Sequence, residues 1–314
     1  MPQDSVIIST PTDTFTVSSL QDLPDSIRAL LPPELWQIQS SKPKDNQIQL
    51  VWIIIIIVLI AVLPPLIRLL WENYKQQKYK KLIAKKGPEY DLILRYSHPY
   101  YRKLTGDMQV EFLKRTIEFI QSKNFEYVGL KSDERMPLLI SAAAIQLTFG
   151  LEHYLLDHFK TIYVMERSYH YGFSTQPFEG HVNYNGIYLS WDSFSKQFED
   201  YKDGSNVGLH EMAHALAYVN FSVDDGLDPA FRGRFYEFSK IARPIFNDIQ
   251  KNGSVFLGTY ATTNYNEFWA VCVENFFERP ETFQNQLPEL YKGLCILLNQ
   301  DPLAKDFIIT PPGG

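Results

Sequence analysis

The chain has 314 residues, of which 45% are hydrophobic and 14% aromatic, so it can bury one large core or two small ones. Its formal net charge of -6 argues against nucleic-acid binding, which normally depends on a face of clustered Lys and Arg. The two cysteines, Cys272 and Cys295, are too few for a disulfide framework and lack the CxxC pairs of a thiolate zinc site, so we expect free thiols.

A long apolar segment follows a polar N-terminal tail. Residues 1–46 are rich in Ser, Thr, Pro, Gln and Asp, which predicts a mostly disordered tail. Residues 47–72 are predicted to form a transmembrane helix, because Leu50 to Ile67 carries no charge and residues 50–71 would span about 33 Å of lipid bilayer as a helix. The alternatives are a buried core helix and a signal sequence.

Lysines are concentrated on the C-terminal side of this segment. They are Lys75, Lys78, Lys80, Lys81, Lys85 and Lys86, whereas only Lys42 and Lys44 lie just before it. The positive-inside rule therefore predicts a single-pass protein with its N-terminus outside and the following domain in the cytoplasm, as in a bacterial inner membrane. Residues 73–98 are predicted to be a basic linker that also attracts anionic lipid head groups.

Residues 99–314 are predicted to form one domain, because helical and extended patterns alternate there without long low-complexity stretches. Helical periodicity marks residues 106–121 and 136–149, and strand-like runs follow at residues 161–165 and 181–191. Further helices are predicted at 207–219, after a turn and cap at residues 203–206, and at 231–250, 267–277 and 288–298.

The second strand-like run predicts a tight hairpin. The pair Asn185-Gly186 lies between Val182 to Tyr184 and Ile187 to Leu189, and such a pair favours a two-residue hairpin loop. We also expect the strand Ile187 to Trp191 to offer an edge along which an extended substrate can pair.

The helix predicted at residues 207–219 carries the motif H-E-x-x-H as His210, Glu211 and His214. Residues four apart share a helix face, so both imidazoles can reach one ion. Catalytic zinc takes such neutral imidazole nitrogens and keeps one position for water. Glu211 is then placed to act as the general base that removes a proton from that water. The alternative is a chance match on a helix that carries His and Glu without a metal.

A third protein ligand is required, and Glu267 is the residue that we expect to supply it. It begins a helix in which almost every neighbour is apolar, so its charge needs a partner. The alternative is that Glu267 only closes a capping box with Asn264. Glu274, on the same helix face, is expected either to orient a ligand histidine or to form a buried salt bridge.

Three longer stretches carry a family resemblance. They are Gly186 to Asp192, Val207 to Leu216 and Tyr260 to Pro280. They resemble the zinc metallopeptidases typified by the Mlc titration factor A protein, which are related in arrangement to the catalytic domain of anthrax lethal factor. The resemblance implies an α+β fold, a mainly helical zincin-like metallopeptidase domain with a small β-sheet. The sequence departs from the family pattern at Ala217, where these proteins usually have an acidic residue.

The resemblance also implies roles for individual residues. One Zn²⁺ ion would be bound by His210, His214 and Glu267, a gluzincin-type set, with Glu211 as the base. Tyr260 would lie near the metal, where its hydroxyl can donate to the oxyanion that forms when water attacks the peptide carbonyl. From the residues alone, Tyr260 is a packed aromatic side chain.

We therefore expect a membrane-anchored zinc peptidase that hydrolyses peptide or protein substrates. The alternative, which the resemblance permits, is a membrane-tethered scaffold that binds a cytoplasmic transcriptional regulator. In that case the zinc would serve only the fold, and a structural site has no use for a base such as Glu211.

Overall fold

The computed structural model describes residues 6–9, 14–17, 25, 29, 46–172, 177–199, 201–223 and 228–304. The chain divides into two compact units, Met1–Lys78 and Tyr79–Gly314. In the first unit, strands β1 (Val6–Ser9) and β2 (Thr14–Val17) pair antiparallel. Both strands lie in the tail for which the sequence predicts disorder, and most of the remaining tail lies outside the described residues.

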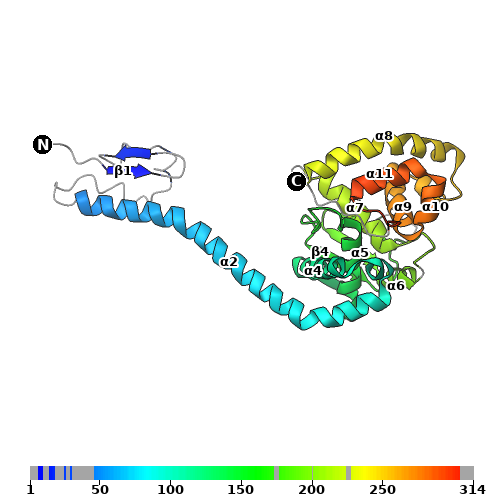
Figure 1. The fold of residues 1–314 in the computed structure, drawn as a ribbon, viewed down its shortest axis with the longest axis horizontal. Coiled ribbons are helices and arrows are strands. Elements are labelled where there is room, and N and C mark those ends of the chain that lie inside the picture. Colours follow the sequence, from blue (N-terminus) through cyan, green and yellow to red (C-terminus); the bar gives the residue numbers. More distant parts are fainter. Residues whose placement is uncertain are drawn as a thin grey trace. The chain divides into compact units, whose positions relative to one another are not determined.

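Helix α2 (Asn46–Ser97) contains the apolar segment and continues beyond it (Figure 1). Its window Trp52–Trp71 has a mean hydropathy of 2.9 and is long and apolar enough to cross a membrane. The helix continues to Ser97, through almost all of residues 73–98, for which the sequence predicts a linker. Because Tyr90 and Leu94 near its C-terminal end are buried in the core of the second unit, that unit starts before residue 99.

The second unit holds a four-stranded sheet in the order β3-β4-β6-β5. Its strands are β3 (Asn124–Val128), β4 (Thr161–Met165), β5 (Gly180–Asn183) and β6 (Gly186–Ser190). Strands β3, β4 and β6 are parallel, and β5 runs antiparallel to β6. The expectation that residues 187–191 form an edge strand is therefore wrong, because β6 lies between β4 and β5. The two edges of the sheet are formed by β3 and β5.

The hairpin between β5 and β6 turns one residue earlier than predicted. Asn183 pairs with Gly186, so the loop residues are Tyr184 and Asn185. The side-chain Oδ1 of Asn183 accepts a hydrogen bond from the backbone N–H of Asn185 at 2.9 Å, which closes an Asx turn. Gly186 serves a different purpose, since a Cβ there would lie 2.6 Å from the carbonyl oxygen of Thr161 on β4.

Helices supply most of the core beside this sheet. They are α3 (Pro99–Lys103), α4 (Gly106–Ser122), α5 (Arg135–Thr148), α6 (Trp191–Glu199), α7 (Val207–Phe221), α8 (Pro229–Asn252), α9 (Tyr265–Glu278), α10 (Pro280–Gln286) and α11 (Pro288–Leu298), with a short 3-10 helix η3 (Tyr260–Thr262). All six helices predicted in this unit are confirmed, as α4, α5, α7, α8, α9 and α11. The fold is thus α+β and mainly helical, as the sequence predicts.

Helices α7 and α9 pack against each other, and α8 lies beside α11 (Figure 1). The indole Nε1 of Trp269 on α9 donates to the carbonyl oxygen of Ala213 on α7 at 3.0 Å, and both residues are buried. Leu209 and Met212 of α7 are also fully buried, and each such side chain contributes roughly 1.5–3 kcal/mol of hydrophobic stabilisation. This contact holds α7, which carries the H-E-x-x-H motif, against α9, which carries Glu267.

The core also contains a buried neutral histidine, His98. Its Nδ1 accepts a hydrogen bond from the backbone N–H of Tyr101 at 3.3 Å, and its ring packs edge-on against Phe112 and Phe198. Burial lowers the pKa of His98 to about 3, and the charge of Arg102 acts in the same direction.

We expect His98 to make the fold sensitive to acid. Between about pH 6.5 and pH 3 the unfolded chain binds a proton at this residue that the folded chain does not, so stability falls as the pH falls through that window. Between about pH 7.5 and pH 5 this residue should cost about 2 kcal/mol of unfolding free energy. Denaturant unfolding of the full chain and of His98→Gln at both pH values measures the effect. Equal losses in the two proteins would contradict it.

Candidate metal centre

The start of α7 is held in place by side chains of α9. Asn206 caps α7, because its side-chain oxygen accepts a hydrogen bond from the backbone N–H of Leu209 at 3.0 Å. The backbone N–H of Asn206 donates to Glu274 Oε2 at 2.6 Å, and its Nδ2 donates to Glu278 Oε1 at 2.8 Å. The cap predicted from the sequence is confirmed, and it fixes the rotation of α7 about its axis relative to α9.

This rotation brings three potential metal ligands together. His210 Nε2 lies 3.0 Å from Glu267 Oε2 and 3.1 Å from His214 Nε2, and His214 Nε2 lies 3.3 Å from Glu267 Oε2. At zinc–ligand distances of about 2.0–2.1 Å, two ligands of a tetrahedral ion are about 3.3–3.4 Å apart. The three atoms are therefore close to the spacing that one such ion requires, and they form a group that can hold a metal.

Glu274 lies behind the first of these histidines. Its Oε1 is 2.6 Å from His210 Nδ1, and its carboxylate is buried. A carboxylate hydrogen-bonded to the far nitrogen of a ligand histidine fixes the tautomer and the ring orientation. The contact fits both alternatives that the sequence leaves open for Glu274: it is a buried salt bridge when His210 is protonated, and it orients the ring when His210 binds a metal.

The sequence also leaves two alternatives for Glu267, capping residue or ligand. Asn264 caps α9 alone, since its Oδ1 accepts hydrogen bonds from the backbone N–H groups of Asn266 and Glu267 at 2.9 and 3.1 Å. The carboxylate of Glu267 instead reaches the imidazoles of His210 and His214. The helix start and the candidate ligand are thus adjacent but separate features.

The electrostatics of the group favour a bound cation. Burial alone would lower the pKa of His210, but hydrogen bonds to Glu267 and Glu274 raise it to about 10. Burial would raise the pKa of Glu267, but the two histidines lower it well below its usual range. The centre therefore stabilises positive charge at one point, which a proton or a divalent metal ion can supply.

Glu211 lies beside this group with an unpaired oxygen. Its side chain is buried, burial raises its pKa to about 8, and its Oε2 has no hydrogen-bond partner among the described residues. Gly180 on β5 makes room for it, since a Cβ at Gly180 would lie 2.5 Å from Glu211 Cγ. A buried carboxyl oxygen without a partner is costly, which fits a group that exchanges a proton with a ligand of the pocket.

Tyr260, at the start of η3, also lines the cavity next to His210. Its ring centroid is 5.7 Å from that of His210, and 57% of the residue is exposed. Burial and the nearby carboxylate of Glu267 raise its pKa, so the hydroxyl stays protonated and can donate a hydrogen bond. The structure therefore brings all five residues singled out from the sequence to one place.

These residues line a cavity of about 890 Å³ between β5, α7, α8 and the start of α9. Its wall includes Ala217, the position at which the resemblance leads us to expect an acidic residue. The lining also contains residues that are not predicted from the sequence, namely Gly180 and three cations of α8, Arg232, Lys240 and Arg243. For the cations a signal exists, because they lie eight, three and eleven positions apart on one predicted helix, which are spacings that share a helix face.

Comparison with known proteins agrees with this geometry. The family described as "Glucose-regulated metallo-peptidase M90" matches residues 71–297, which include all five site residues. An uncharacterised protein of Synechocystis sp. is 24% identical over 238 residues, which cover 69% of this chain and 85% of that protein. The Mlc titration factor A of Yersinia enterocolitica is 31% identical over 125 residues, and that of Yersinia pestis is 28% identical over 125 residues.

The match to both titration factors covers 38% of this chain and 46% of each relative, so it spans less than half of their length. The family match is much longer and covers most of the second unit, from the end of the apolar segment to α11. The chain belongs to the glucose-regulated metallo-peptidase M90 family.

Proposed function

We propose that this protein is a zinc-dependent peptidase in which His210, His214 and Glu267 hold one Zn²⁺ ion. The observation that carries the proposal is the convergence of the three ligand atoms within 3.0–3.3 Å on the wall of an open cavity, next to a buried carboxyl with no partner. Membership of a metallo-peptidase family supports it. A structural zinc site would be closed by a fourth protein ligand and would not need the cavity.

The residues around the ligands have separate tasks. Zinc at this site would polarise the scissile carbonyl and lower the pKa of a water molecule toward roughly 7. Glu211 takes a proton from the attacking water and later delivers it to the leaving amine. Tyr260 donates its hydroxyl proton in a hydrogen bond to the developing oxyanion. Glu274 holds the His210 ring in its orientation.

The edge strand β5 is the expected binding site for the peptide backbone. Gly180, His181 and Val182 of β5 line the cavity, and β5 has a neighbouring strand on one side only in the described sheet. An extended peptide can therefore add to β5 by backbone hydrogen bonds and pass next to Glu211. The sequence placed this role on the following strand, which is interior.

The test of the proposed function uses the full chain in detergent micelles with a peptide library. We expect stoichiometric zinc, hydrolysis of some library members, loss of activity after chelation and recovery when zinc is added back. Bound zinc without hydrolysis of any peptide would contradict the peptidase.

That second outcome would favour the alternative function, a scaffold that binds a cytoplasmic regulator. The relatives named Mlc titration factor A support it, because their name refers to titration of another protein. A regulator would then bind without being cut, and chelation would weaken binding only through loss of the fold.

We further propose that Trp52–Trp71 anchors the protein in a membrane with the N-terminus outside and the M90 unit in the cytoplasm. The support is the apolar window and the six lysines that follow it in the sequence. Protease added outside intact spheroplasts should remove a tag at the N-terminus and leave a C-terminal tag intact. The reverse pattern would overturn the orientation.

A further inference from the structure

The cavity wall formed by α8 is positively charged. Apart from Glu211 and Glu267 at the metal centre, the Asp, Glu, Lys and Arg side chains among the described lining residues are all cations, namely Arg232, Lys240 and Arg243. The chain as a whole has a net charge of -6, so the charge of this wall is opposite in sign to the net charge of the chain. A concave surface of one sign raises the local concentration of ligands of the opposite sign.

The cations lie along one face of α8. Arg232, Tyr236, Lys240 and Arg243 follow one another at intervals of three or four residues, which is the repeat of a helix face, and all four line the cavity. At 1.5 Å per residue, Arg232 and Arg243 are about 16 Å apart along the helix axis. An extended peptide covers that distance in about five residues.

The two arginines are available to bind a ligand. Lys240 Nζ already pairs with Glu237 at 2.7 Å, whereas Arg232 and Arg243 form no ion pair with any described residue. Arg243 is positioned by its guanidinium stacking over the Tyr265 ring at 4.5 Å, and both arginines are exposed. A guanidinium binds a carboxylate through two parallel hydrogen bonds, which makes an unpaired arginine a specific carboxylate receptor.

We propose that this α8 wall selects peptides that carry a carboxylate near the scissile bond, bound by Arg232 or Arg243. The inference rests on the proposed peptidase function and names its substrate class. An acidic side chain and a free C-terminus present the same carboxylate, so both sources are to be tested.

The experiment measures kcat/KM of the zinc-loaded full chain in detergent micelles for matched peptides. One pair replaces Glu or Asp by Gln or Asn at each position, and a second pair replaces the C-terminal acid by an amide. We expect a preference of about three- to tenfold for the carboxylate at one position, which is the range of a partly exposed charge-assisted hydrogen bond. The preference should shrink at high salt, because exposed charges are screened.

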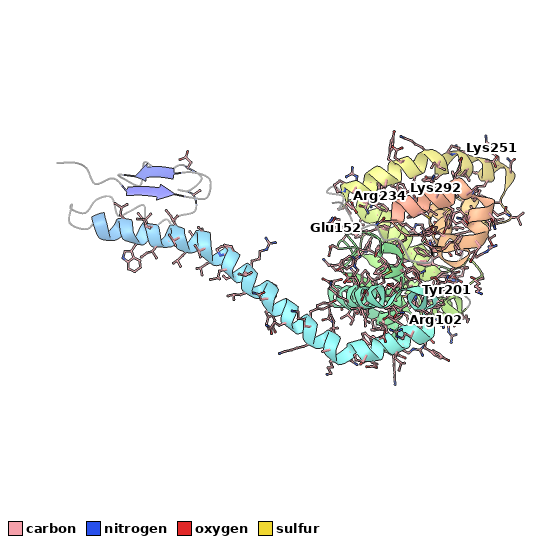
Figure 2. The ribbon with its side chains drawn as sticks, viewed as in Figure 1. Arg102, Glu152, Tyr201, Arg234, Lys251 and Lys292 are labelled. Atoms are coloured by element: carbon pink, nitrogen blue, oxygen red, sulfur yellow. The ribbon has the colours of Figure 1, made fainter. Side chains whose placement is uncertain are left out.

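Variants separate the wall from general charge effects. In Arg232→Gln/Arg243→Gln the preference should fall to about onefold, whereas in Lys251→Gln it should stay as in the unmodified chain. Lys251 is exposed near the C-terminal end of α8, as Figure 2 shows, and lies outside the cavity lining. It removes one charge from the same helix, as the single variants Arg232→Gln and Arg243→Gln each do, and so is the net-charge control for these single variants.

The outcomes distinguish failure of this inference from failure of the peptidase. Equal kcat/KM for acid and amide peptides overturns the inference and leaves the peptidase intact. If no peptide is cut, fluorescence anisotropy of labelled acid and amide peptides decides. Tighter binding of the acid, lost in Arg232→Gln/Arg243→Gln, supports the carboxylate wall and counts against the peptidase. Equal or undetectable binding overturns the wall.

Discussion

Glu211→Gln should lower kcat/KM for peptide hydrolysis by about 10²- to 10⁴-fold and leave zinc bound. A general base contributes rate acceleration of this size, and glutamine has the same shape but accepts no proton. Because the proposed zinc ligands are other residues, metal content and unfolding free energy should change little. The assay compares steady-state kinetics and metal content of the full chain and the variant under identical conditions.

Glu289→Gln is the matched control, because it also replaces one glutamate by glutamine. Glu289 is exposed in the first turn of α11, away from the cavity. It should retain the activity of the unmodified chain. If Glu211→Gln hydrolysed peptides as fast as the control, Glu211 would not be the base, and the attacking water would have to be activated in another way.

Glu267→Ala should release the metal and abolish activity with it. The variant leaves two protein ligands, His210 and His214, and zinc sites of catalytic enzymes have three. Its zinc affinity should therefore fall by more than the tenfold to hundredfold expected for Glu274→Gln, which alters only a group that orients His210. Competition of each variant with a chelator of known affinity gives both constants.

Circular dichroism of the two variants controls for loss of the fold. A Glu267→Ala protein that stayed folded and bound zinc as tightly as the unmodified chain would show that the carboxylate is not a ligand. A larger loss in Glu274→Gln than in Glu267→Ala would exchange the roles of the two carboxylates.

The local parts of the site could be predicted from the sequence. His210, Glu211 and His214 lie within one helical turn and a half, so the geometry of the helix alone places them on neighbouring positions. Glu267 could be predicted as a ligand because an acidic residue among apolar neighbours needs a partner. Its spacing from Asn264 could not exclude a capping role. The helix periodicity of α4, α5, α7, α8, α9 and α11 was readable for the same local reason.

Features that depend on distant segments could not be predicted. The order β3-β4-β6-β5 is set by crossover connections, which the sequence does not reveal. For this reason β6 was predicted to be an edge strand although it is interior. Gly186 was predicted to be a turn residue, but its role is to let the backbones of β6 and β4 approach closely at Thr161. The space for Glu211 on α7 is provided by Gly180 on strand β5, and the cationic wall exists only because α8 lines the same cavity as β5 and α7.

X-ray absorption at the zinc edge of the zinc-loaded full chain measures the ligand set of the metal itself. We expect one zinc per chain, with two imidazole nitrogens and oxygen ligands at about 2.0–2.2 Å. The signal of imidazole scattering should weaken in His214→Ala. A sulfur ligand at about 2.3 Å, or failure of the chain to retain stoichiometric zinc, would contradict a centre built from His210, His214 and Glu267.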